Sequence, residues 1–419
     1  MFRRFLQFSI FILLLTYAVS APAQQQVLTW ENVVQRFEVN NPTLLAARLN
    51  VYEAKADEIT AFLRPNPNLF LAGDQIDPFN VGGSHGPFAF FFPLASVTYL
   101  HERQHKRELR LESAKKATSI TSWQQADTER TLLFNLRSAF VQTLQAKAVY
   151  SVTKENLDYY DRVLGVSGER FKAGDISQLD LDRLQLQRIQ YQSDLQTAEV
   201  NLRTAKIQML TLLNDRTPVE QFDVIGLFDF PDYVLPLAES REIAVASRPD
   251  LRAAIETASK AQTDHRLAVA NGSTDPTLGL DIGRNPPIDL YIGANISIPL
   301  RIFDRNQGNK LRTQLDIART QRLRDAAEAQ VLSDVDSAYA TLSSNLTLLR
   351  PYKEKYLQQA VRVRDTVTFA YQNGGASLLD FLSAQAEYRT VQLSYVNLVG
   401  SYLIAASQLN LSVGREVIP

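Results

Sequence analysis

Two stretches of the chain carry apolar residues at alternating spacings of three and four positions. The first stretch contains Leu195, Ala198, Leu202, Ala205, Met209 and Leu212, and the second contains Tyr395, Leu398, Tyr402, Ala405 and Leu409. A spacing that averages 3.5 residues places one apolar stripe along a helix and requires a partner helix in a left-handed supercoil. The pattern therefore predicts coiled-coil helices in the middle and at the end of the chain.

Residues 94–217 contain no proline. The glycines of this span are Gly165, Gly168 and Gly174. The span therefore predicts a long helix over residues 103–172, a turn at Gly174 and a second long helix. At a rise of 1.5 Å per residue the first helix would be roughly 100 Å long. A soluble coiled-coil rod would show the same periodicity, so the helices alone do not decide the architecture.

Predicted strands, in which polarity alternates with a period of two, distinguish a membrane protein from a soluble rod. Apolar Leu278, Leu280 and Ile282 alternate with small or polar residues, and residues 290–298 do the same. The first half of the chain offers less regular strands at 69–72 and 88–97. Lengths near ten residues and alternating polarity are typical of strands that span a membrane.

The chain contains an internal duplication. Residues 171–180 (FKAGDISQLD) return at 371–380 (YQNGGASLLD), and Asn41-Pro42 returns as Arg248-Pro249. Each half predicts a helix, a strand pair, a long helix, a turn and a second long helix. We expect repeats at 24–216 and 240–415, a crossover at 217–239 and a tail at 416–419.

The amino terminus has the pattern of a targeting segment. Arg3 and Arg4 precede an apolar run over residues 5–19, and the small residues Ala21 and Ala23 follow it. These features predict a cleaved signal peptide over residues 1–23 and an exported protein. A membrane anchor is the alternative, but the run is short for a bilayer span of about 20 residues.

Composition excludes several classes of site. The chain has 44 Lys and Arg against 45 Asp and Glu, so its net charge of -1 gives no field that attracts nucleic acid. It contains no cysteine, which excludes disulfides, thiolate metal sites and a cysteine nucleophile. We expect no cofactor and no nucleic-acid partner.

Four strands per chain cannot close a barrel, and an open sheet edge is not tolerated in lipid. Two copies would supply eight strands, and side chains would fill the interior of such a barrel. Three copies would supply twelve strands, and a twelve-stranded barrel can leave a lumen. The predicted fold class is therefore mainly α with a β-barrel part. Three copies would share a 12-stranded transmembrane barrel, continued by a tunnel of long coiled-coil helices.

The two Gly-x-x-Ser-x-Leu-Asp motifs, from Gly174 to Asp180 and from Gly374 to Asp380, resemble those of the TolC family of outer-membrane factors. The resemblance implies a homotrimeric passive duct in the bacterial outer membrane that extends into the periplasm. It also implies outer-membrane lipid, a periplasmic membrane-fusion adaptor and an inner-membrane pump of the RND type as partners. Residues 298–309 resemble the CzcC-like heavy-metal-efflux branch, although residues 101–104 lack that branch's glycines. Metal cations, drugs and proteins of type I secretion all remain candidate cargoes.

The resemblance also assigns site residues. It implies that Asp380 lines the closed periplasmic aperture with Asp180 nearby, and that Ser383 replaces a second family aspartate. The alternative interpretation makes Asp180 and Asp380 N-terminal helix caps. The glycines permit positive φ in a turn, and the resemblance implies adaptor contacts at the tips through Phe171, Gly174, Ser177, Leu179, Tyr371, Gly374, Gly375, Ser377 and Leu379.

One motif offers an enzymatic alternative. His101, Glu102 and His105 form an H-E-x-x-H sequence, which binds zinc when it lies on a helix. The motif follows a predicted strand, precedes Lys106 and Arg107, and lacks a nearby third ligand. We therefore expect no enzyme, and we interpret the basic residues 103–110 as a solvated helix face. A periplasmic coiled-coil scaffold is the other alternative function.

Overall fold

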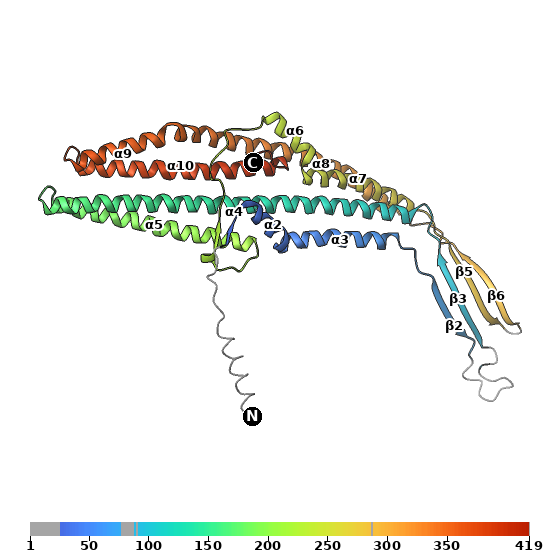
Figure 1. Ribbon diagram of the computed structural model, residues 1–419. Helices are drawn as coiled ribbons and strands as arrows, with labels where there is room; N and C mark the ends of the chain where they lie inside the picture. The colour runs from blue at the N-terminus through green and yellow to red at the C-terminus, as the bar shows by residue number, and fades with distance from the viewer. Residues whose placement is uncertain (1–25, 77–87, 89–90, 286–287, 419) are drawn as a thin grey trace, which may run out of the picture.

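The computed structural model describes residues 26–76, 88, 91–285 and 288–418. The predicted signal peptide lies outside the described residues. Within them the chain forms an elongated body in which long helices run side by side and a small sheet extends from one end (Figure 1). The two helical hairpin tips lie at the opposite end.

The elements of the two halves follow the same order. The first half contains β1 (Gln26–Leu28), α2 (Trp30–Asn40), α3 (Pro42–Phe62), β2 (Asn68–Asp74), β3 (Phe92–Leu100), α4 (Lys106–Lys172) and α5 (Gln178–Leu212). The second half contains α6 (Leu237–Ser247), α7 (Pro249–Asn271), β5 (Thr277–Asn285), β6 (Ile288–Ser297), α8 (Gln307–Pro351), α9 (Leu357–Gln372) and α10 (Leu378–Val413). The order of α-helices and β-strands in the second half thus repeats that of the first half from α2 onwards, with α8 and α9 together in the place of α4.

Local sequence explains where the short helices begin. Pro42 and Pro249 occupy the first turns of α3 and α7, where a missing N–H costs nothing. The Asn41 side chain also caps α3 by accepting a hydrogen bond from the Leu44 N–H at 3.0 Å. The capping residue and the proline together fix the bend between α2 and α3.

The long helix of the first half is close to the prediction. α4 has 67 residues and begins at Lys106 rather than at 103, because Gln104 and His105 adopt positive φ angles of 59° and 54°. No helix among the described residues is both long enough and apolar enough to cross a bilayer. The heptad positions expected on α5 and α10 face their partners, and Ala198, Ala205, Met209, Tyr402, Ala405 and Leu409 are all buried.

The corresponding helix of the second half is interrupted. Pro351 ends α8, and a π-helical turn at Tyr352–Tyr356 separates it from α9. A π turn and a proline each bend a helix by displacing its hydrogen-bond ladder. This interruption is not among the elements that the sequence pattern predicts.

The strands of both halves form one antiparallel sheet in the order β2-β3-β5-β6. Strand β3 begins at Phe92, four residues later than expected, and ends at Leu100. In the register, Val97 lies opposite Leu69 on one side and opposite Leu280 on the other. The outer edges of β2 and β6 have no strand partner within the described chain.

The crossover between the halves packs at the middle of the long helices. It contains a 3-10 turn (Val219–Gln221) and β4 (Phe222–Val224), which pairs in parallel with β1. Phe222 and Val224 are fully buried, and the Tyr402 hydroxyl of α10 donates to the Pro231 carbonyl at 2.8 Å. The crossover therefore ties both helical hairpins together at one level.

Candidate functional site

The first tip turns through a glycine at the end of α4. Gly174 has φ of 83°, and its N–H donates to the Phe171 carbonyl at 3.0 Å. The next N–H, of Asp175, reaches the Arg170 carbonyl at 2.9 Å. These two bonds form a Schellman motif, which satisfies the last carbonyls of the helix and requires a left-handed residue.

The second tip repeats this geometry. Gly374 has φ of 78°, and the Gly375 N–H donates to the Ala370 carbonyl at 2.7 Å. Gly375 itself does not have positive φ, so the interpretation that it serves a left-handed turn is wrong. Only the first glycine of the Gly-Gly pair does this, at the position equivalent to Gly174.

Serines begin the helices that follow both tips. The side chains of Ser177 and Ser377 accept hydrogen bonds from the N–H groups of Asp180 and Asp380, each at 3.1 Å. The aspartates are thus the third residues of α5 and α10, and the interpretation that they are N-caps is wrong. In the second tip Asp380 also accepts from the Ser377 N–H at 3.1 Å, which completes a capping box.

The capping box sets the charge of Asp380. Hydrogen bonds from the Ser377 side chain and backbone lower the pKa of this exposed carboxyl group. Asp380 is therefore ionised at neutral pH. Ser383 is exposed one turn later on α10, whereas Asp180 is partly buried. Leu179 and Leu379 are 59% and 73% exposed, so each tip presents an apolar side chain to a surface outside this chain.

An aromatic cluster lies directly behind the tips. Phe381 is fully buried between Tyr371, whose ring stacks on it at 4.9 Å, and Tyr160 at 6.4 Å. Tyr371 is only 4% exposed, so the prediction that its side chain contacts an adaptor does not fit this position. It packs the two hairpins together instead, because Tyr160 belongs to α4 and Tyr371 to α9.

Polar contacts also join the two hairpins. The Arg389 guanidinium of α10 donates to Asp194 of α5 at 2.7 Å and lies over the ring of Tyr191 at 5.2 Å. Near the tips, Arg170 donates to the Tyr371 carbonyl at 2.8 Å. These contacts are not among those that the sequence pattern predicts. The 200-residue repeat could have suggested the contact between Arg389 and Asp194. It makes position 189 of α5 equivalent to Arg389 of α10, and position 189 is five residues from Asp194.

The H-E-x-x-H motif does not form a zinc site. His101, Glu102 and His105 precede α4, and the side chain of His105 is 88% exposed. The two imidazoles therefore do not share one face of a helix. Glu102 forms an ion pair with Arg110 instead. Within the described residues no group of three His, Cys, Asp or Glu side chains could hold a metal ion.

The same junction corrects the interpretation of residues 103–110 as a solvated face. Lys106 is only 4% exposed, and its ammonium group donates to Asp275 at 2.5 Å and to the Ser273 carbonyl at 3.0 Å. The Arg103 N–H donates to the same carboxylate at 2.9 Å. Asp275 lies two residues before β5, so this buried ion pair fastens the sheet to the start of α4.

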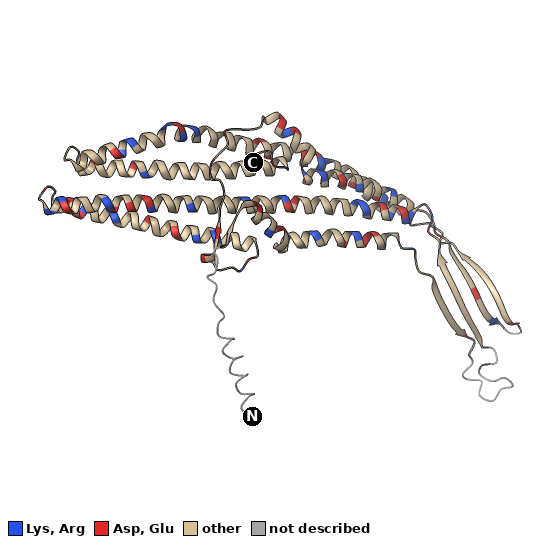
Figure 2. Ribbon diagram, in the orientation of Figure 1, with Lys and Arg blue, Asp and Glu red and all other residues tan. Residues whose placement is uncertain are grey.

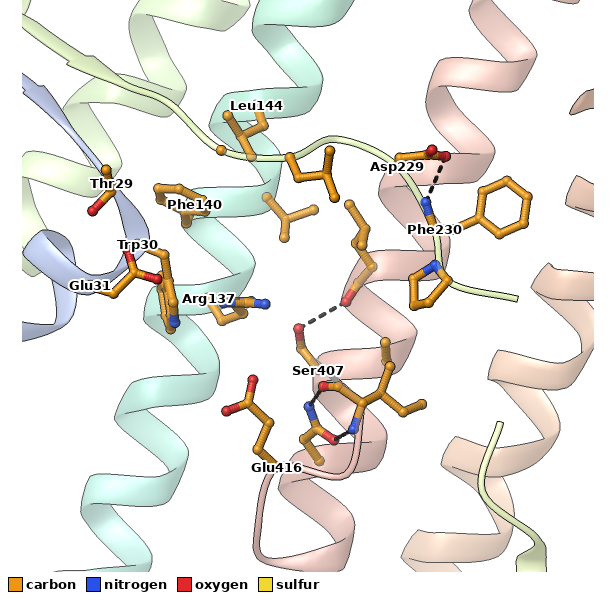
Figure 3. A pocket seen from close by; sticks show the side chains of 18 of the residues that line it. Thr29, Trp30, Glu31, Arg137, Phe140, Leu144, Asp229, Phe230, Ser407 and Glu416 are labelled. Atoms are coloured by element: carbon orange, nitrogen blue, oxygen red, sulfur yellow. Dashed lines mark hydrogen bonds between the residues drawn. The ribbon is translucent and has the colours of Figure 1, made fainter. Parts of the chain in front are cut away.

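A large cavity lies elsewhere, beneath the crossover. It has a volume of about 930 Å³ and is lined by α2, α4, α10 and the crossover segment. Figure 3 shows Arg137 reaching from α4 towards this space, and its guanidinium lies 4.5 Å from the Trp30 ring. None of the site residues predicted from the sequence lines this cavity. The tips and the cavity are therefore separate features of the fold.

Comparisons with known proteins agree with this arrangement. Residues 241–415 match the model of the outer membrane efflux protein family. The chain is 24% identical over 321 residues to the cobalt-zinc-cadmium resistance protein CzcC of Cupriavidus metallidurans, covering 74% of each chain.

Solved structures share the fold. A CusC structure has a TM-score of 0.77 and 18% identity, with 92% of each chain covered. The open state of the Neisseria gonorrhoeae MtrE outer membrane channel has a TM-score of 0.73 and 16% identity, covering 96% of this chain and 94% of MtrE. Over its second repeat the chain is therefore similar to the outer membrane efflux protein family, and it shares its fold with solved outer-membrane channels.

Proposed function

We propose that three copies of this chain form the exit duct of a tripartite efflux system, with metal cations as its cargo. The similarity to outer membrane efflux proteins and to CzcC supports an outer-membrane efflux channel that extends into the periplasm. The trimer, the cargo and the gate residues are the parts of this proposal that go beyond this similarity.

The open edges of the sheet carry the proposal of a ring. Strands β2 and β6 each leave one row of backbone groups without a strand partner in the described chain. One face of the sheet is apolar, and Leu69, Val97, Leu280 and Ile292 on it are between 50% and 76% exposed. Such a sheet is unstable in water and incomplete in lipid. Pairing β6 of one copy with β2 of the next in a closed ring of three satisfies both requirements.

The tips supply the gate and the docking surface of the proposed duct. On a threefold axis the three exposed Asp380 side chains would approach one another and hold cations at the aperture. Ser383, one turn later, would add no charge. The exposed Leu179 and Leu379 would contact an adaptor, which in turn would connect the duct to an inner-membrane pump of the RND type.

The relatives favour metal cations over drugs or secreted proteins. CzcC is a cobalt-zinc-cadmium resistance protein and covers three quarters of this chain. A passive duct needs no metal-binding centre of its own for this cargo, because a pump would provide the driving force. The experiment for the cargo is to delete the gene and compare growth in cobalt, zinc or cadmium with growth in antibiotics. Sensitivity to the antibiotics alone would contradict the metal assignment.

Conductance tests the duct and its gate together. Purified protein in planar bilayers should give cation-dependent conductance, which millimolar divalent or trivalent cations block from the periplasmic side. The Asp380→Asn variant should lose most of this block, whereas Asp182→Asn, an exposed change on α5, should retain it. Absence of any conductance would contradict the duct, and an unchanged block in Asp380→Asn would remove Asp380 from the gate.

A further inference from the structure

The two faces of the sheet differ in chemistry. One face carries Leu69, Leu71, Val97, Leu280 and Ile292, which are exposed and apolar. On β3, β5 and β6 the opposite face carries mainly glycine and polar residues, namely Ser96, Thr98, Gly279, Asp281, Gly283, Gly293 and Asn295, although Phe70 of β2 and Leu94 of β3 share it. In a closed membrane barrel the apolar face contacts lipid and the polar face lines the lumen. The alternation thus places every second residue of β5, including Asp281, in the lumen.

Asp281 is isolated among the strand residues. Figure 2 shows that the strands are almost free of charged residues, in contrast to the helices. The other charged residues in the described strands of the four-stranded sheet are Asp74, Arg284 and Asp289, which all lie within two residues of a strand end on the hairpin side. Asp281 stands at the centre of β5, which runs from Thr277 to Asn285. The middle of the barrel wall therefore carries one charge per chain.

Neighbouring strands hold this carboxylate in place. Ser96 of β3 donates to Asp281 Oδ1 at 2.5 Å, and Asn295 of β6 donates to Oδ2 at 2.8 Å. Ser96 is buried, so its hydroxyl has little alternative to this bond. The two hydrogen bonds thus hold the carboxylate in one orientation among the three strands.

Glycines on the same face make this arrangement fit. A methyl group on Gly279 would lie 2.6 Å from the Asn295 amide nitrogen, so the amide reaches Asp281 only because position 279 has no side chain. A methyl group on Gly293 would lie 3.6 Å from Asp281 Oδ2. The glycines therefore leave room for the hydrogen bonds and keep the carboxylate uncovered.

We propose that Asp281 is a charge-selectivity residue of the barrel lumen, which favours the exit of cations and disfavours the entry of anions. The inference rests on the proposed trimeric duct, in which three copies of Asp281 encircle the lumen at one height. It is independent of Asp380, which lies at the opposite end of the molecule. The negative charge of both carboxylate rings suits the proposed cargo, because metal cations would pass the ring of Asp380 and the ring of Asp281.

Reversal potentials in planar bilayers test this inference. With a tenfold KCl gradient at low ionic strength, the wild-type channel should be cation-selective. In Asp281→Asn the ratio of K+ to Cl− permeability should fall at least roughly threefold, because one unit charge at several ångströms in water already has about this effect and the trimer loses three. Asparagine keeps the shape of the side chain, and the Ser96 hydroxyl and Asn295 amide can each reverse their hydrogen-bonding role. The variant should therefore fold.

Matched variants separate the inference from the duct itself. Asp289→Asn removes the same charge at the hairpin end, where the side chain is 93% exposed, and should change the ratio little. Asp281→Lys should reverse the preference to anions. A wild-type protein without conductance would overturn the duct. Normal conductance with an unchanged permeability ratio in Asp281→Asn and Asp281→Lys would overturn the inference alone.

Discussion

The buried ion pair at the junction of sheet and helices gives the most quantitative prediction. Lys106→Met keeps most of the aliphatic stem but removes the ammonium group that contacts Asp275 at 2.5 Å. The Asp275 side chain is only 16% exposed, so it would be left as a poorly solvated charge. Removing one partner of a buried ion pair costs roughly 3–5 kcal/mol of stability. The Arg103 N–H still binds this carboxylate, which places the expected loss at the lower end, about 3 kcal/mol.

Acidity should modulate this loss in a defined direction. Burial raises the pKa of Asp275, but the hydrogen bonds from Lys106 and from the Arg103 N–H outweigh it and hold the pKa below its usual range. A group with a lowered pKa in the folded state stabilises the fold above its unfolded pKa of about 4 and loses this contribution as pH falls through the folded pKa. The difference between wild type and Lys106→Met should therefore be largest at neutral pH and narrow below about pH 4.

Thermal unfolding followed by circular dichroism in detergent measures both effects. At pH 7 the variant should melt roughly 3–6 °C below wild type, since 1 kcal/mol shifts the melting temperature of a large domain by a few degrees at most. The double variant Lys106→Met/Asp275→Asn should recover part of the loss, because it leaves no unpaired charge. Equal melting temperatures for wild type and Lys106→Met would refute the assignment of a buried pair.

Two further predictions concern the tips and the contact between hairpins. Gly174→Ala and Gly374→Ala should each lower stability by roughly 1–2 kcal/mol, because alanine is strained at positive φ; Gly375→Ala should be nearly neutral, since its nearest contact is 3.6 Å away and its φ is not positive. Chemical denaturation compares the three, and equal losses would contradict the turn assignments. Arg389→Ala removes the contact with Asp194 that joins α10 to α5. The two hairpins should then separate more readily, and single-channel recordings of the proposed duct should show more frequent opening. Arg319→Ala, which breaks an ion pair within α8, is its control, and equal opening in both variants would contradict the role of Arg389.

Periodicity and repetition predicted most of the fold. The 3-4 spacing identified the packed faces of α5 and α10, and the alternation at Leu278, Leu280 and Ile282 identified β5, because both patterns record which side of an element is covered. The observed start of β3 lies four residues after the expected one because Phe88 belongs to a turn, in which its carbonyl accepts a hydrogen bond from the Phe91 N–H at 3.1 Å. The π turn after Pro351 was missed because proline predicts a bend but not how the helix continues.

The site was less predictable than the fold. Ser177 and Ser377 could have been identified as caps, because each stands three residues before an aspartate in the capping-box pattern. The burial of Tyr371 and Lys106 could not be predicted from the sequence, because it depends on segments from the other half of the chain. Asp281 appeared only as one polar residue of an alternating strand. Its isolation and its bonds to Ser96 and Asn295 required the register of three strands.

Disulfide cross-linking tests the central claim most directly, which is that three copies close the sheet through β2 and β6. The chain has no cysteine, so a pair introduced at Leu69 of β2 and at Leu290, Ile292, Ala294 or Ile296 of β6 in turn reports only on the proposed seam. At one of these four positions, oxidised outer membranes should yield a covalent trimer, because opposed residues on one face of paired strands lie within disulfide range. Cysteine at Leu69 with Gly293, which lies on the other face, should give monomers. Monomers at all four positions would contradict the account.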